Sequence, residues 1–304
     1  MTGARCLREY PSGCPPPAAI APTRPPLKPG ATLFYLPQYP LSREAAAERD
    51  KFVETRLKYG VDEQGRAHAQ VPVFTIPKPD TTDRRVLFDD SAGSSLNMVK
   101  VGLQLPRHLE LQSFLRDAKI LSSIDLASFF MTIRIVPEER DHWTYDGGMH
   151  GRVRNKRLVQ GNSESPAIAQ AFLTHVFHDM PELRGKWLVY IDNIYIKGIT
   201  TNRKTHISDL GVLARGLAKY NLLMNLRKSI FLGTQDISVL GVDWSVGGAW
   251  GVPDYRAADL LKLPQPQTAK EIQRLCGGVN AISAHLPWSQ VLLAPFYEMT
   301  ERKD

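Results

Sequence analysis

The run Trp187-Leu-Val-Tyr-Ile-Asp-Asn-Ile-Tyr-Ile196 decides how this sequence folds. Nearly all of it is β-branched or aromatic, which is typical of a strand, but its centre carries two polar residues. Polar side chains at the centre favour the tip of a hairpin over one continuous buried strand. The run therefore predicts a β-hairpin that presents Asp192 and Asn193 at its turn.

A second acidic residue ends another short strand-like run, Lys119-Ile-Leu-Ser-Ser-Ile-Asp125. If the two strands lie side by side, Asp125 and Asp192 come within reach of one pair of divalent cations. Mg²⁺ takes a few hard oxygen ligands together with substrate phosphates, the arrangement that suits in-line phosphoryl transfer. An aspartate by itself at such a place more often simply ends a strand or makes a turn, because Asp is common in turns. Spacing alone leaves both interpretations open.

Periodicity and capping signals predict the remaining elements. Helices are expected over 42–59, 165–180 and 204–223 and from the capping box Thr268-Ala-Lys-Glu271 onward, and a strand is expected over 71–77. The order of these elements lacks regular βαβ alternation. It predicts a mixed α+β chain.

Composition narrows the class of protein. The 304 residues carry 38 Lys and Arg against 31 Asp and Glu, a net charge of +7, which slightly favours a polyanionic partner. With 43% hydrophobic residues, the chain is not expected to be disordered in bulk. Because no uninterrupted apolar run reaches spanning length, it is not expected to be embedded in a membrane. Residues 1–35 are rich in proline and are predicted to be a disordered tail. No apolar leader follows the N-terminus, so an intracellular protein, cytoplasmic or nuclear, without a membrane partner is expected.

Four stretches then come in the order and approximate spacing of a reverse transcriptase palm. They are SSIDLASFF (122–130), VQGNSESPAIAQAF (159–172), YIDN (190–193) and LLMNLRKSIFLGTQDISVLGV (222–242). Over about residues 36–290 the chain resembles the reverse transcriptases of LTR-type or related retroelements. The resemblance implies a right-hand polymerase with fingers over 36–118, a palm over 119–250 and the start of a thumb over 251–304. The rest of the thumb and an RNase H are expected to be absent from this chain.

The resemblance also assigns roles residue by residue. Asp125, Asp192 and the carbonyl of Leu126 match the ligands of two Mg²⁺ or Mn²⁺ ions, and Asn193 stands beside them in the catalytic hairpin. Phe130 matches the aromatic ring that presses on a ribose 2′-hydroxyl and so selects dNTP, although it also suits a place in the core. The other implied contacts are Lys78, Arg85, Gln160, Gly161 and Lys228 to the nucleotide, and Leu240 and Gly241 to the primer.

A basic segment adds an electrostatic argument. His150-Gly-Arg-Val-Arg-Asn-Lys-Arg157 carries four cations and no acid. Beside a cleft, Arg152, Arg154, Lys156 and Arg157 would bind the phosphate backbone of an RNA or DNA template with its primer. As a hairpin the same segment could simply be solvated.

Two features depart from the family pattern. Asn193 stands where the hairpin of the family has a second aspartate, so an oxygen ligand remains but a formal charge is lost. In the fingers, Asp90-Ser91 replaces the usual Tyr-Arg, and the spacing from Asp89 to Asn97 is longer than usual. The first interpretation is an RNA-directed DNA polymerase; the second is a degenerate or repurposed module that binds nucleic acid without polymerising. An RNA-dependent RNA polymerase is disfavoured by the bulk of Phe130.

Overall fold

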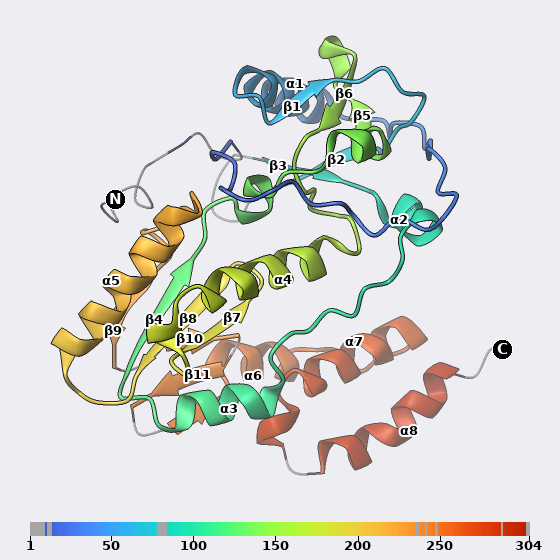
Figure 1. The fold of residues 1–304 in the computed structure, drawn as a ribbon. Helices are drawn as coiled ribbons and strands as arrows, with labels where there is room; N and C mark the ends of the chain where they lie inside the picture. The colour runs from blue at the N-terminus through green and yellow to red at the C-terminus, as the bar shows by residue number, and fades with distance from the viewer. Residues whose placement is uncertain are drawn as a thin grey trace. The chain divides into compact units, whose positions relative to one another are not determined.

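A computed structural model describes the chain at residue 10 and over 14–77, 84–234, 237–240, 242–246, 249–286 and 288–301 (Figure 1). Lys78 and Gly241, to which the sequence analysis assigns contacts, lie outside the described residues. The chain divides into two compact units. The first comprises 1–106, 124–196 and 207–229, and the second comprises 107–123, 197–206 and 230–304.

Eight α-helices and five short 3-10 helices lie in the described parts of the chain. The α-helices are α1 (Arg43–Lys58), α2 (Ser91–Asn97), α3 (His108–Arg116), α4 (Ser165–His178), α5 (Arg203–Lys219), α6 (Asp254–Leu261), α7 (Ala269–Asn280) and α8 (Ser289–Glu301). The 3-10 helices are η2 (Phe129–Thr132), η3 (Pro137–Trp143), η4 (Gly148–His150), η5 (Pro181–Leu183) and η6 (Ser283–His285).

The strands form small sheets. They are β1 (Asp62–Gln64), β2 (Val73–Pro77), β3 (Arg84–Phe88), β4 (Ile120–Asp125), β5 (Thr144–Asp146), β6 (Arg152–Asn155), β7 (Trp187–Tyr190), β8 (Asn193–Gly198), β9 (Ile230–Gly233), β10 (Ile237–Val239), β11 (Val242–Ser245) and β12 (Ala249–Gly251). Their orders are β7-β8-β4-β9, β1-β6-β5, β2-β3 and β10-β11-β12. The mixture of helices and strands confirms the predicted α+β class.

The core of the first unit forms around α4. Ser165-Pro166 opens this helix, where proline fits because the first turn needs no N–H donor. Ala169, Phe172 and Val176 then fall on one face and are buried. This face packs against η2 and the β7-β8 hairpin, with the rings of Phe172 and Phe129 stacked 5.8 Å apart. Figure 1 shows α4 lying along the hairpin. The core therefore lies directly beneath the hairpin tip.

The N-terminal segment contradicts the expected disorder. Cys14 and Ala18 are buried in the core of the first unit. The N–H of Ala18 donates to the carbonyl of Thr132 at 2.8 Å, and that of Ala19 donates to the carbonyl of Tyr220 at 3.0 Å. The amino-acid composition of a segment reflects only the apolar surface of the segment's own side chains. Here the segment covers apolar surface and open carbonyl groups that the rest of the unit supplies, so the prediction of disorder is wrong for its described residues.

The second unit holds the C-terminal helices. The predicted capping box is present, because the Thr268 hydroxyl accepts from the N–H of Glu271 and the Glu271 carboxylate accepts from that of Thr268. Ile272 and Cys276 of α7 pack against Leu293 of α8. Amphipathic packing rather than propensity stabilises such short helices.

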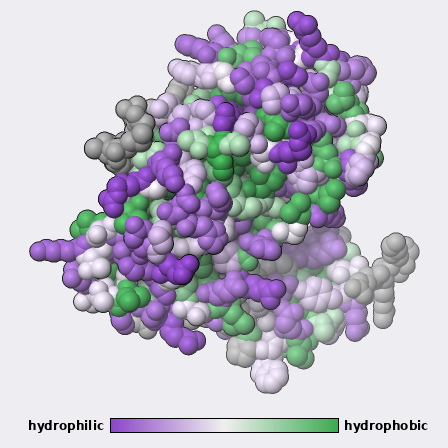
Figure 2. Space-filling model, viewed as in Figure 1, coloured by the Kyte–Doolittle hydropathy of each residue, from purple (hydrophilic) through white to green (hydrophobic). Residues whose placement is uncertain are grey.

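Figure 2 shows hydrophilic residues over much of the face in view, with apolar residues scattered between them. Within the described ranges, no helix is long and apolar enough to cross a membrane.

Two neighbouring alanines test the packing of the N-terminal segment. Ala18→Asp places a charge in the core and should lower the free energy of unfolding by about 2–4 kcal/mol. The same change at the exposed Ala19 should stay within about 0.5 kcal/mol. Urea unfolding of both variants beside wild type makes the comparison. Equal stability of the two variants would mean that the segment is not packed.

Candidate active site

The hairpin tip is built on a strained turn. Tyr190 and Asn193 form the last pair between β7 and β8, so Ile191 and Asp192 make the two-residue turn. Ile191 has a φ of +57°, a region that hairpin turns need and that glycine usually occupies. For a β-branched residue this conformation is strained and must be held by its surroundings. The predicted hairpin is present, with Asp192 in the turn and Asn193 at the start of β8.

Gln170 holds the strained turn. Its Oε1 accepts from the N–H of Ile191 at 2.7 Å, and its Nε2 donates to the carbonyl of Val189 at 3.2 Å. The side chain is buried on α4. One amide therefore fixes both the end of β7 and the residue before Asp192. Gln170 has no predicted role, although a polar residue on the apolar face of α4 signals a buried partner.

Asp125 lies beside this turn. β4 ends at Asp125, and the N–H of the next residue, Leu126, donates to the carbonyl of Asp192 at 3.0 Å. The carbonyl of Asp125 accepts from the N–H of Asn225 at 2.8 Å, and its own N–H donates to the Ser229 hydroxyl at 3.1 Å. The structure thus brings the two predicted aspartates together, each fixed through its backbone.

The two carboxylates influence each other. Burial raises the pKa of Asp192, and the negative charge of Asp125 raises it further. A backbone hydrogen bond and the ammonium of Lys228 act in the opposite direction. Like charges held together in a half-buried place are relieved by a cation. The electrostatics of the pair therefore favour binding of a positive ion.

The available donors suit Mg²⁺. Two carboxylates and the carbonyl of Leu126 are hard oxygens, the ligand type that Mg²⁺ prefers. Asn193 adds no charge, and its Nδ2 donates to Asp192 Oδ1 at 3.2 Å. No cluster of three or more His, Cys, Asp or Glu that could hold a metal occurs in the described ranges. Water and a phosphate-bearing substrate would have to complete the coordination.

A glycine loop lies next to β3. Gly161 has a φ of +106°, and a Cβ there would stand 2.1 Å from the carbonyl oxygen of Phe88. Only glycine allows this approach. Gln160, which precedes it, is exposed. Because Phe88 ends the strand that carries the exposed Arg85, the structure brings two of the predicted nucleotide-binding segments together.

The remaining predicted residues have different surroundings. Phe130 is 9% exposed and packs edge-on against Phe129, so it belongs to the core, and its contact with a nucleotide sugar stays a prediction. Lys228 is exposed. Leu240, the described half of the predicted primer contact, lies in the turn that follows β10 with a φ of +53°.

The basic segment is largely occupied by contacts within the fold. Arg154 pairs with Glu63 at 2.9 Å and with Asp141 at 2.7 Å. Arg157 is buried, and burial with the neighbouring guanidinium groups lowers its pKa to about 10. Pairing and burial could not be read from a run of cations. Arg152 and Lys156 are half-buried, and their contact with nucleic acid stays a prediction.

Removing the Gln170 amide should loosen the turn. Gln170→Met keeps the length of the side chain but leaves Ile191 N–H and Val189 C=O without their partner, which should cost about 1–3 kcal/mol. Hydrogen exchange at Ile191 should accelerate in proportion. Gln273→Met, at an exposed position of α7, is the matched control and should change neither quantity. Unchanged exchange at Ile191 in Gln170→Met would contradict the stabilising role of the two Gln170 hydrogen bonds, which together form the Gln170 clamp.

Comparison with known sequences agrees with this geometry. The family model described as reverse transcriptase (RNA-dependent DNA polymerase) matches residues 67–244. The chain is 26% identical over 266 residues to the Pro-Pol polyprotein of simian foamy virus type 3 (strain LK3), covering 86% of this chain and 22% of the polyprotein. It is 24% identical over 247 residues to the retrovirus-related Pol polyprotein from transposon opus of Drosophila melanogaster, covering 80% and 24%. The chain thus spans under a third of these relatives.

Solved structures show the same fold. A foamy viral protease-reverse transcriptase in complex with double-stranded DNA superimposes with a TM-score of 0.76 at 22% identity, over 98% of this chain and 49% of that one. One in complex with an RNA/DNA hybrid gives 0.71 at 22% identity, over 98% and 37%. The reverse transcriptase-like polymerase fold that the sequence predicts is therefore confirmed. Because the family model matches more than half of this chain, the chain belongs to the reverse transcriptase (RNA-dependent DNA polymerase) family.

Proposed function

We propose that this chain is the RNA-directed DNA polymerase domain of a retroelement. In the reaction the 3′-hydroxyl oxygen of a primer attacks the α-phosphorus of a dNTP, a new P–O bond forms, and pyrophosphate leaves. The observation that carries the proposal is the meeting of Asp125, at the end of β4, with Asp192, in the strained hairpin turn. The hydrogen bond from Leu126 N–H to the carbonyl of Asp192 fixes that meeting.

The aspartates would act by holding divalent cations. Asp125 and Asp192, with the carbonyl of Leu126, would hold two Mg²⁺ or Mn²⁺ ions. Such ions lower the pKa of a bound hydroxyl and neutralise charge on the phosphates. The Gln170 clamp and the backbone bonds of Asp125 would keep the two carboxylates in place before substrate arrives, which reduces the reorganisation that the reaction requires.

Other residues would bind the nucleotide. Arg85 and Lys78 would hold the triphosphate, since a planar guanidinium and a flexible ammonium both suit polyphosphate. Gln160 and Gly161 would approach the incoming nucleotide from the neighbouring loop. Phe130 would exclude a ribose 2′-hydroxyl. Lys228, exposed on the segment after α5, would neutralise the departing pyrophosphate.

The proposed macromolecular partner is an RNA or DNA template paired with a primer. The solved foamy viral relatives are complexes with double-stranded DNA and with an RNA/DNA hybrid. The net charge of +7 fits a polyanion, and Leu240 with Gly241 would contact the primer.

A second function rests on Asn193. Its amide donates to Asp192 Oδ1, where the family pattern has a second carboxylate. The loss of one negative charge weakens the attraction for cations. A module that binds nucleic acid without polymerising is therefore the alternative.

Primer extension on poly(rA)–oligo(dT) separates the two functions. Wild type should extend the primer, and Asp192→Ala should lower the rate at least about 100-fold because a metal ligand is lost. Asn193→Asp should reach half-maximal rate at a lower Mg²⁺ concentration, since it adds a charge beside Asp192. The rate is measured against Mg²⁺ and, separately, Mn²⁺.

Asp179→Ala is the matched control, because Asp179 pairs with Lys219 away from the hairpin tip. It should extend at the wild-type rate. If wild type does not extend the primer but Asn193→Asp does, the site is disabled at one metal ligand. If neither wild type nor any variant extends the primer while all still bind the duplex, nucleic-acid binding without polymerisation is the function.

Nucleotide choice tests Phe130. Phe130→Val removes ring volume at the sugar and should reduce the preference for dTTP over UTP by about tenfold or more. Phe129→Val is the matched control, since Phe129 is the adjacent buried ring of the same cluster. The control should lose stability but keep the nucleotide preference. An equal loss of preference in both variants would make Phe130 a core residue only.

A further inference from the structure

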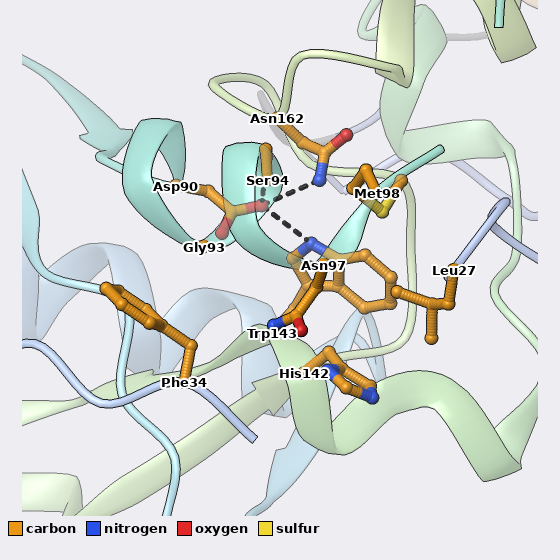
Figure 3. A pocket seen from close by; sticks show the side chains of 10 residues that line it. All are labelled: Leu27, Phe34, Asp90, Gly93, Ser94, Asn97, Met98, His142, Trp143 and Asn162. Atoms are coloured by element: carbon orange, nitrogen blue, oxygen red, sulfur yellow. Dashed lines mark hydrogen bonds between the residues drawn. The ribbon is translucent and has the colours of Figure 1, made fainter. Parts of the chain in front are cut away.

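Asp90 is a buried carboxylate that receives three donors on one oxygen. Ser94 Oγ, Trp143 Nε1 and Asn162 Nδ2 lie 2.9, 3.1 and 2.6 Å from its Oδ2 (Figure 3). The side chain stands at 4% exposure beside a pocket with room for roughly one water molecule. The three donors come from three separate segments: α2, η3 and the loop after Gly161.

The loop of Gln160 and Gly161 has no regular secondary structure of its own to hold it. Asn162 is buried, and each polar atom of its side-chain amide makes one hydrogen bond. Nδ2 donates to Asp90, and Oδ1 accepts from the N–H of Glu164 at 2.9 Å. Asn162 therefore ties the loop both to Asp90 and to the start of α4. Gln160 lies two residues away, exposed to solvent.

Asp90 also stands two residues after β3, the strand that carries Arg85. Gly161 approaches the carbonyl of Phe88 at the end of the same strand. Two contacts, one through Gly161 and one through Asp90–Asn162, thus join the strand and the loop. Both parts belong to the nucleotide site of the proposed function.

The chemistry of the bond suits an anchor. Burial raises the pKa of Asp90, while the hydrogen bonds from Asn162, Ser94 and Trp143 oppose that rise. Hydrogen bonds to a carboxylate are shorter and stronger than those between neutral groups, and the 2.6 Å bond to Asn162 is the shortest of the three. A buried carboxylate is costly without such donors, so the contact holds its geometry.

We propose that Asp90 is a positioning residue for the incoming nucleotide: through Asn162 it holds Gln160 and Gly161 in place against the strand of Arg85. The inference rests on the proposed function and extends it to a residue that touches no substrate. Asp90 falls at the position where the sequence departs from the family pattern.

Steady-state kinetics separate positioning from stability. Asp90→Asn keeps the shape of the side chain and loses its charge. Asn162→Ala removes the hydrogen bond that joins the loop to residue 90. Each should raise the KM for dNTP about tenfold while kcat changes less than about threefold, because binding rather than chemistry is affected. The double variant should be no worse than Asn162→Ala alone, since Asp90→Asn weakens and Asn162→Ala removes the same hydrogen bond.

Two control variants perturb equally buried groups but leave the hydrogen bond between Asp90 and Asn162 in place. Trp143→Phe removes another donor to the same carboxylate, and Asp62→Asn disrupts a buried pair with Arg56 elsewhere in the unit. Both should lower the melting temperature and leave the KM for dNTP unchanged. A tenfold rise of KM in either control, or an unchanged KM in Asp90→Asn and Asn162→Ala, would overturn the proposal.

Hydrogen exchange keeps this inference distinct from the proposed function. Amides of 158–164 should exchange at least about fivefold faster in Asp90→Asn and Asn162→Ala than in wild type and Trp143→Phe, because only those two changes free the loop. If wild type incorporates no dNTP, the proposed function fails while faster exchange still supports the anchoring of the loop. If exchange in 158–164 is the same in all variants, Asp90 does not position the loop, whatever the activity.

Discussion

Two negative charges held together are the constraint on which the rest of the first unit depends. The negative charge of Asp125 opposes ionisation of the Asp192 carboxyl and helps to raise its pKa, so holding the two residues together is costly. The protein fixes their backbones, through Leu126 N–H to the Asp192 carbonyl and through the Gln170 clamp on the strained turn. The core beneath α4 supplies the rigidity that this arrangement requires.

The parts of the fold that the sequence predicts correctly are governed by local signals. The hairpin follows from two polar residues within a β-prone run, and α7 follows from a capping box that the structure contains. Ser42 caps α1 as expected, because its hydroxyl accepts from the N–H of Ala45. Such signals involve residues a few positions apart, so no knowledge of the tertiary structure is needed.

The parts that sequence reasoning missed depend on distant partners. Arg154 looks like a free cation until Glu63 and Asp141 are brought to it by the pairing of β1 with β6 and by η3. Gln170 and Asp90 have no visible role until the hairpin and the glycine loop lie against them. The residues that hold the site in place were therefore harder to predict than the aspartates and glycine that form it.

The contacts of the N-terminal segment have a consequence for folding during synthesis. Ala18 emerges from the ribosome more than 100 residues before Thr132, and Ala19 about 200 residues before Tyr220, yet these are their hydrogen-bond partners. The segment must therefore wait, unpaired, until the rest of the unit exists. Proline suits that wait, because it keeps a chain extended and hydrated and removes donors that could pair wrongly. The composition that suggests permanent disorder instead belongs to a segment that can dock only after Thr132 and Tyr220 have been made.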